Sequence, residues 1–94
     1  MNVKSVLEQY HALYERQFKG DYDAVCALVD LDRAIALAGL TARQSEALTL
    51  VYGDDLTQAS AGERMGTSQQ AVGIALDAAI TKIQRIYDGW EDVL

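Results

Sequence analysis

The stretch from Leu56 to Ile83 constrains the fold more than any other part of the sequence. The segment 57–65 is short and is polar on one side, which predicts a first helix. Gly66 can end that helix, because glycine adopts the left-handed backbone conformation without a steric penalty. Ser68 is placed to cap a second helix by accepting a hydrogen bond from its first turn. Two helices joined by so tight a corner form a helix-turn-helix unit.

The second helix of this unit is amphipathic. At about 100° per residue, its apolar side chains fall within about 80° of Val72 on either side and form one stripe over about five turns. The stripe consists of Val72, Ala75, Leu76, Ala79, Ile80, Ile83, Ile86, Tyr87 and Trp90. We expect the stripe to be buried. The opposite face, which in a DNA-binding helix-turn-helix is roughly the side that enters the major groove, carries Gln70, Gly73, Ile74, Asp77 and Thr81.

The remaining segments also predict helices. Apolar residues at spacings of three and four indicate one amphipathic helix over 3–19, which ends at Gly20. These residues are Val3, Val6, Leu7, Tyr10, Leu13, Tyr14 and Phe18. Asp21 is placed to cap a helix that runs to about Ala38 and closes at Gly39. The apolar positions of this helix are Tyr22, Val25, Leu28, Val29, Leu31 and Ile35.

Thr41 and Gln44 have the spacing of a capping box at the start of a third helix. A polar corner at residues 53–55 then leads to Leu56. Proline is absent, and glycines separate the helical segments at short intervals. The sequence therefore predicts an all-α fold, a small bundle of about five helices.

A chain of 94 residues, half of them apolar, makes one small domain. Within it we expect residues 1–40 to form a helical pair that either completes the core or makes a dimer surface. Residues 41–88 hold the helix-turn-helix, and residues 89–94 form an acidic tail. Trp90 lies on the continuation of the apolar stripe. It either packs against the bundle or belongs to an exposed docking element.

The charge balance argues against general affinity for nucleic acid. Eight Lys and Arg residues stand against fourteen Asp and Glu residues, which gives a net charge of −6, and no segment is basic. Such a chain gains no general attraction to phosphate. It has neither a run of about 18 apolar residues nor the basic-then-apolar start of a secretion signal. We therefore expect a cytoplasmic protein that does not contact membranes.

No set of residues points to catalysis. Cys26 is the only cysteine and His11 the only histidine, and both are expected to be structural. The acids between Asp21 and Asp32 are explained by the helix dipole and by solvent exposure. The chain has no phosphate-binding glycine loop, no Ser/His/Asp set and no metal-ligand spacing. We expect no enzyme, no catalytic residue, no metal site, no cofactor and no small-molecule ligand.

Three stretches carry a resemblance to a known family. They are LTARQSEALTLVY at 40–52, LTQASAGERMGTSQQAV at 56–72 and AAITKI at 78–83. In this order they resemble region 4 of the bacterial sigma-70 factors, the domain that reads the promoter −35 element, and especially the sigma-like helix-turn-helix proteins of phages and prophages. The resemblance implies a protein that acts in the cytoplasm of a bacterial host cell.

The resemblance also implies a binding face. In the family the first residues of the recognition helix are commonly Arg and Glu, and those places are taken here by Gln69 and Gln70. The face for DNA or a protein partner is Ser68, Gln69, Gln70, Gly73, Ile74 and Asp77, with Arg43 and Arg64 on backbone phosphates. A glutamine amide can pair with adenine N6 and N7. The sequence departs from the family pattern in four ways. Gly73 has no side chain, Ile74 is a hydrocarbon, Asp77 adds a negative charge, and residues 68–81 contain no Lys or Arg.

Two hypotheses follow. The first is a phage- or prophage-type transcriptional regulator that acts through DNA, RNA polymerase or both. The second is a degenerate helix-turn-helix that binds a protein instead, such as a sigma factor, RNA polymerase or another regulator, because an exposed Ile74 suits a helix better than a phosphate. A small terminase-like subunit is a further alternative. A homodimer is favoured by the large apolar face of residues 3–19 and would double the phosphate contacts.

Overall fold

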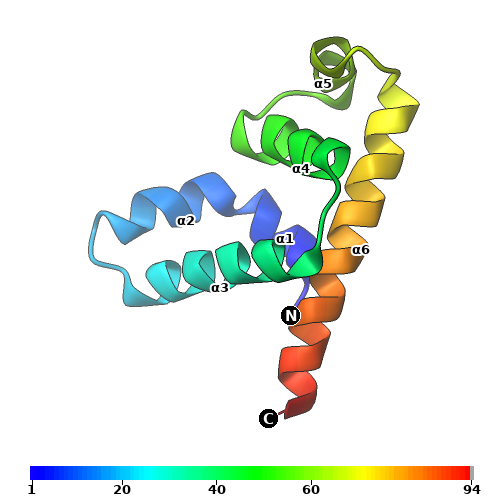
Figure 1. The fold of residues 1–94 in the computed structure, drawn as a ribbon. Helices are drawn as coiled ribbons and strands as arrows, with labels where there is room; N and C mark the ends of the chain where they lie inside the picture. Colours follow the sequence, from blue (N-terminus) through cyan, green and yellow to red (C-terminus); the bar gives the residue numbers. More distant parts are fainter. Residues whose placement is uncertain (94) are drawn as a thin grey trace.

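The computed structural model describes residues 1–93, and these form six α-helices and one π-helical turn, with no strand. The elements are α1 (Val3–Glu8), α2 (Tyr10–Gln17), α3 (Tyr22–Ala38), α4 (Ala42–Leu48), the π-helix η1 (Thr49–Gly53), α5 (Gln58–Met65) and α6 (Gln69–Val93). Figure 1 shows α6 as a long rod along one side of the molecule, with the other helices to one side of it or across its start. The predicted all-α fold is confirmed.

The predicted capping residues set the helix boundaries. The Asp21 carboxylate accepts a hydrogen bond from the Ala24 backbone N–H at the start of α3. The Arg16 side chain, which also bonds this carboxylate, holds the pKa of Asp21 below its usual value. Before α4 the predicted capping box is present, since the Gln44 N–H donates to the Thr41 hydroxyl oxygen at 3.1 Å and the Thr41 N–H donates to Gln44 Oε1 at 3.0 Å.

The prediction of one helix over residues 3–19 is wrong. The chain breaks at Gln9, whose N–H is shared between the carbonyl oxygens of Ser5 and Val6 at 3.2 and 3.1 Å. This tightened turn separates α1 from α2 and lets them take different partners. Helix α1 contacts α6, whereas α2 lies along α3 to form a hairpin (Figure 1). Long-range packing therefore overrides an apolar spacing that one continuous helix would also satisfy.

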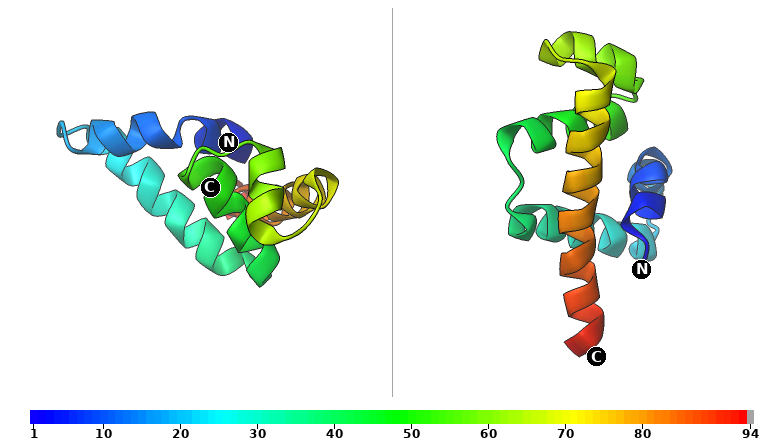
Figure 2. Two further views of the ribbon diagram at one scale, coloured as in Figure 1. Left: turned by 90° about the horizontal axis from the view of Figure 1, so that it is seen from above. Right: turned by 90° about the vertical axis from the view of Figure 1, so that its right-hand side faces the viewer.

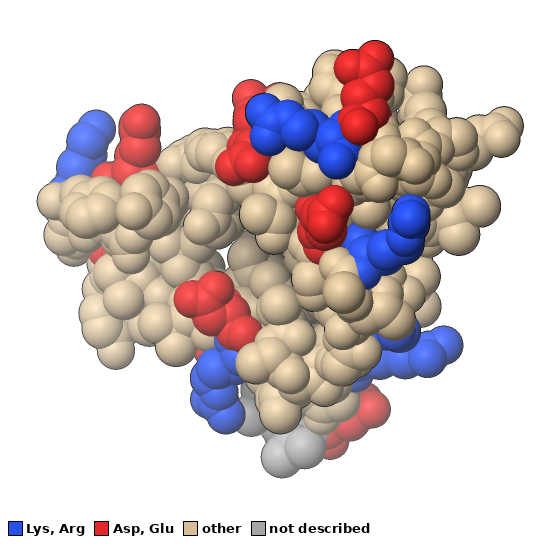
Figure 3. Space-filling model, turned by 45° about the horizontal axis from the view of Figure 1, so that its top comes forward, with Lys and Arg blue, Asp and Glu red and all other residues tan. Residues whose placement is uncertain are grey.

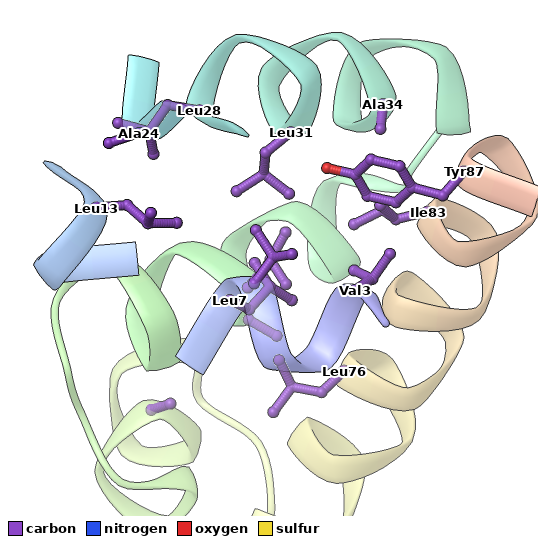
Figure 4. Packing of buried hydrophobic residues seen from close by; sticks show 14 of the residues in the cluster. Val3, Leu7, Leu13, Ala24, Leu28, Leu31, Ala34, Leu76, Ile83 and Tyr87 are labelled. Atoms are coloured by element: carbon purple, nitrogen blue, oxygen red, sulfur yellow. The ribbon is translucent and has the colours of Figure 1, made fainter. Parts of the chain in front are cut away.

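The hydrophobic core collects along the apolar stripe of α6. Figure 4 shows Val3 and Leu7 of α1 packed between Leu31 of α3 and Leu76 of α6. Of the predicted stripe, the fully buried members are Val72, Leu76, Ala79, Ile83 and Tyr87, and the half-buried members are Ala75, Ile80, Ile86 and Trp90. The predicted burial of this stripe is confirmed.

The amino terminus is fastened to the second half of α6. The Val3 N–H donates to Gln84 Oε1 at 2.9 Å, and Gln84 Nε2 donates to the Met1 carbonyl oxygen at 2.6 Å. The terminal ammonium group pairs with Glu91. These polar bonds lie beside the buried Val3 side chain, so they hold α1 against the core.

Helix α6 continues through Val93, so residues 89–93 of the predicted acidic tail are helical; Leu94 lies outside the described residues. The ring of Trp90 meets the ring of Tyr87 edge-on, with centroids 5.2 Å apart. The guanidinium carbon of Arg33, on α3, lies over the Trp90 ring at 5.8 Å from its centroid. Of the two alternatives for Trp90, packing against the bundle is the one observed.

The apolar residues of α3 do not all enter the core. Its buried side chains are Ala24, Leu28, Leu31 and Ala34, whereas Tyr22, Val25 and Val29 are exposed. The prediction treated these apolar positions as one set, but they occupy two opposite faces, and α1, α2 and α6 cover only one of them. Within the described residues, none of the helices is long and apolar enough to cross a membrane.

Replacing Ile83 with Ala tests the position of the core. Ile83 is fully buried on α6, so the lost contacts and the cavity left behind should lower the free energy of unfolding by about 2–5 kcal/mol. Ile74→Ala is the matched control, because Ile74 lies on the same helix but is 71% exposed. Urea unfolding followed by circular dichroism measures both. Equal effects of the two substitutions would contradict this core.

Candidate nucleic-acid interface

Helices α5 and α6 form the predicted helix-turn-helix at one end of the molecule, where α5 crosses the start of α6 (Figures 1 and 2). The Thr57 hydroxyl oxygen caps α5 by accepting from the Ser60 N–H. Gly66 ends α5 in the left-handed conformation with φ of 68°. Ser68 Oγ then accepts from the Ala71 N–H at 3.1 Å and caps α6. The predicted corner is confirmed, with Gly66 and Ser68 in their predicted roles; the Thr57 cap was not predicted.

The corner is held by a close contact that the sequence analysis missed. Gly62 lies in the middle of α5, and its carbonyl oxygen accepts from the Thr67 N–H at 2.8 Å. A Cβ at Gly62 would lie 2.9 Å from the Thr67 carbonyl oxygen and 3.3 Å from the Gln69 nitrogen. The backbones of α5 and the corner therefore touch here. A glycine within an otherwise helical pattern is the available sequence signal for such a contact.

The residues of the predicted binding face lie on the first turns of α6. Ser68, Gln69, Gln70 and Asp77 are exposed, and Ile74 is 71% exposed. Their shared exposure follows from the burial of Val72 and Leu76 on the other side of the helix. The end of α6 that they occupy carries these side chains outward, away from the core.

Gly73 is the exception within this set. It is half-buried, and a Cβ built on it would lie 3.2 Å from Oε1 of Gln58 on α5. Gly73 therefore faces α5 and belongs to the contact between the two helices. The amide of Gln58 takes the space that a side chain at 73 would fill, which explains why a residue without a side chain fits here.

Few cations surround this face. Arg43 on α4 and Arg64 on α5 are both exposed, as the predicted phosphate contacts require. Lys82 lies further along α6 but is directed to α4, where its Nζ donates to Gln44 Oε1 at 2.8 Å. Figure 3 shows Lys and Arg side chains interspersed with Asp and Glu, with no continuous basic surface on the side in view. The electrostatic attraction of this end for phosphate is correspondingly small.

An unpredicted π-helical turn joins this unit to α4. In η1 the Asp54 N–H donates to the Thr49 carbonyl oxygen at 2.9 Å, and Asp55 then takes a positive φ of 60°. Burial raises the pKa of the half-buried Tyr52 in this turn, with smaller contributions from the charges of Glu8 and Asp77. The turn also lines an open hollow of about 190 Å³ between α1, α3 and α4. The turn therefore links the helix-turn-helix to the core.

A family model described as Sigma-70, region 4 matches residues 36–85, which is more than half of the chain. The chain belongs to the sigma-70 region 4 family. No curated protein and no solved structure matched it. The family is a DNA-binding helix-turn-helix domain with roles in transcription, not a family of enzymes, and its members generally contact DNA and RNA polymerase.

The sigma-70 region 4 match has a clear structural extent. It begins in the last turns of α3 and covers α4, η1, α5 and α6 as far as Arg85. The resemblance quoted for residues 40–83 is confirmed. Helices α1 and α2 and most of α3 lie outside the match, so the hairpin is added to a region 4 unit.

Replacing Gly62 with Ala tests the corner. The added Cβ would meet backbone atoms of the corner at 2.9–3.3 Å, and the forced shift should lower the free energy of unfolding by about 1–3 kcal/mol. Gly89→Ala is the control, because a Cβ at Gly89 on α6 meets nothing within 4 Å and should be neutral or stabilising by up to about 1 kcal/mol. Thermal unfolding compares the two. A Gly62 variant as stable as the Gly89 variant would contradict the close contact.

Proposed function

We propose that this protein is a transcriptional regulator of the phage or prophage type, which reads DNA with the start of α6 and acts together with RNA polymerase. The observation that carries the proposal is the exposure of Gln69 and Gln70 side by side on the first turn of α6, in a helix-turn-helix whose corner is fully formed. Membership of the sigma-70 region 4 family supports it. The phage origin rests on the resemblance of the sequence.

Base recognition is assigned to the two glutamines. A glutamine amide donates to N7 and accepts from N6 of adenine in the major groove, and a good bidentate pair contributes about 1–3 kcal/mol of discrimination. Ile74 lies about one turn further along the same exposed face and can contact a thymine methyl group. This face therefore favours adenine and thymine over guanine, which is commonly read by Arg.

The phosphate contacts are assigned to Arg43 and Arg64, one on α4 and one on α5. Each phosphate neutralised contributes about −0.9 to the slope of log K against log salt concentration, so two contacts give a slope of only about −2. A net charge of −6 adds no general attraction. One copy of the chain therefore binds DNA weakly, and tight binding needs further contacts from RNA polymerase or from a second copy.

A purely protein-binding role is the second candidate, and a specific observation favours it. Ile74 is 71% exposed in the middle of the face, with Asp77 beyond it and no Lys or Arg from Ser68 to Thr81. An exposed aliphatic side chain with small neighbours suits the surface of another helix. The partner in this case is a sigma factor, RNA polymerase or another regulator.

The double variant Gln69→Ala with Gln70→Ala tests DNA reading. Loss of two base contacts of about 1–3 kcal/mol each should weaken binding by at least about 30-fold, while circular dichroism stays unchanged because both side chains are exposed. The measurement is a gel shift on duplexes selected by the native protein from a random pool. Gln9→Ala, an exposed glutamine between α1 and α2 and outside the predicted face, is the control. Unchanged binding by the double variant would remove this face as the reader.

Ile74→Arg separates the two candidates. On DNA, the added guanidinium should make one more phosphate contact and steepen the salt slope by about 1. If the face binds a protein instead, the charge should disrupt the apolar contact and abolish capture of RNA polymerase or a sigma factor in a nuclease-treated pull-down. A variant that loses its protein partner and shows no change in salt slope would favour the second candidate.

A further inference from the structure

The hollow beside η1 is lined by helical elements that are far apart in the sequence. Helices α1, α2, α3 and α4 and the π-helix η1 all contribute lining residues, and the volume is about 190 Å³. Figure 1 shows the α2–α3 hairpin on one side, with α4 above it. A cavity of about 150 Å³ is enough to hold a benzene molecule. The hollow therefore has room for a ring with a short tail that reaches its open side.

The inner wall of the hollow is apolar. Leu7, Leu31 and Leu48, from α1, α3 and α4, line it and are buried in the hydrophobic core. Ile35 and Leu40 line it as half-buried neighbours. A hydrocarbon placed against these side chains would be removed from water, which favours binding. The inner wall therefore suits a ligand with an apolar body.

The open side of the hollow is polar and negatively charged. Asp32, Ser45 and Thr49 line it and are exposed, so their oxygen atoms can accept hydrogen bonds. Among the described residues that line the hollow, Asp32 alone carries a charge. Arg33, its neighbour in sequence, lies over the Trp90 ring instead. An anionic ligand would therefore meet a carboxylate that no lining cation offsets.

Two tyrosines and two further acids add to the attraction for a cation. Tyr10 and Tyr52 line the hollow and are half-buried, and the face of a tyrosine ring attracts an ammonium group. Burial raises the pKa of Tyr52, and the charges of Glu8 and Asp77 raise it further. Both carboxylates therefore lie close enough to act on this ring. The same negative charge would stabilise a positively charged ligand beside it.

We propose that the hollow binds a small organic cation, with a primary ammonium group on an apolar body about the size of one ring. The body lies against Leu7 and Leu48, and the ammonium group donates to Asp32 and to the hydroxyl oxygens of Ser45 and Thr49. The proposal goes beyond the proposed function and does not depend on it. The sequence analysis expected no small-molecule ligand, and the lining residues, spread from position 7 to position 53, share no sequence motif.

Isothermal titration calorimetry of the full chain tests the preference for positive charge. The probes are 2-phenylethylamine, a cation at neutral pH, its uncharged counterpart 2-phenylethanol, and the anion phenylacetate. The amine should bind with a dissociation constant of about 1 mM or below, within the ligand-efficiency limit for so small a molecule. The alcohol should bind at least about fivefold more weakly, since an ion pair at an exposed carboxylate is modest in strength, and phenylacetate should bind more weakly still. No binding of the amine, or equal affinity for amine and alcohol, would overturn the proposal.

Asp32→Asn identifies the acid that holds the ammonium group. This variant should bind 2-phenylethylamine about fivefold more weakly and should leave the affinity for 2-phenylethanol unchanged. Asp30→Asn is the matched control, because Asp30 is an exposed acid on the same helix that does not line the hollow. It removes the same charge and should leave both affinities unchanged. An equal loss in the two variants would indicate general attraction to an acidic surface and would contradict the site.

Ser45→Trp blocks the hollow. Ser45 is exposed on α4 and lines the hollow, so the indole should fill it and lower the affinity for both the amine and the alcohol at least about tenfold, with the circular dichroism of a folded chain. Ser5→Trp, at an exposed serine outside the lining, is the control and should bind both probes normally. Unchanged binding by Ser45→Trp would place the ligand elsewhere.

Nuclear magnetic resonance of the native protein locates the ligand without any substitution. Titration with 2-phenylethylamine should shift the methyl groups of Leu7 and Leu48 and leave those of the exposed Ile74 unchanged. Shifts that spare both leucines would overturn the proposal. None of these experiments contains DNA, so their failure is distinguishable from a failure of DNA reading.

Discussion

Burial of one side of α6 is the interaction on which the rest of the structure depends. Helices α1, α3, α4 and α5 all contact α6, and its buried stripe runs from Val72 beside the corner to Tyr87 beside α3. The exposed side of the same helix carries Gln69 and Gln70. Because one rigid helix carries both faces, packing about three turns away from the glutamines fixes the direction in which they point. The fold and the orientation of the proposed binding face therefore depend on the same buried contacts.

The features that could be predicted from the sequence depend on short-range chemistry. Asp21, the Thr41–Gln44 capping box, Gly66 and Ser68 each bond or bend the backbone within three or four residues of themselves, so the helix ends were found from local pattern. The buried stripe of α6 followed from helical periodicity. The exposure of most of the binding face followed from the same periodicity, since burial of one side leaves the other outside.

The features that were missed depend on contacts between distant segments. The residues near Gln9 do not show whether the chain forms one helix or two. The break follows from the packing of α1 against α6 and of α2 against α3. The approach of Gly62 to Thr67 and of Gly73 to Gln58 depends on how two helices cross. The outward face of α3 was mistaken for part of a single apolar set, because an apolar residue has the same sequence pattern whether its own chain or another molecule covers it.

The central claim is that the exposed side of α6 reads DNA while its buried side holds the fold. Nuclear magnetic resonance of labelled protein, titrated with a duplex selected from a random pool, tests it most directly. The account predicts shifts of the side-chain amides of Gln69 and Gln70 and of the Ile74 methyl groups, while the methyl groups of Leu76 and Ile83 stay unchanged. Shifts centred on the α2–α3 hairpin, or absent from α6, would contradict it.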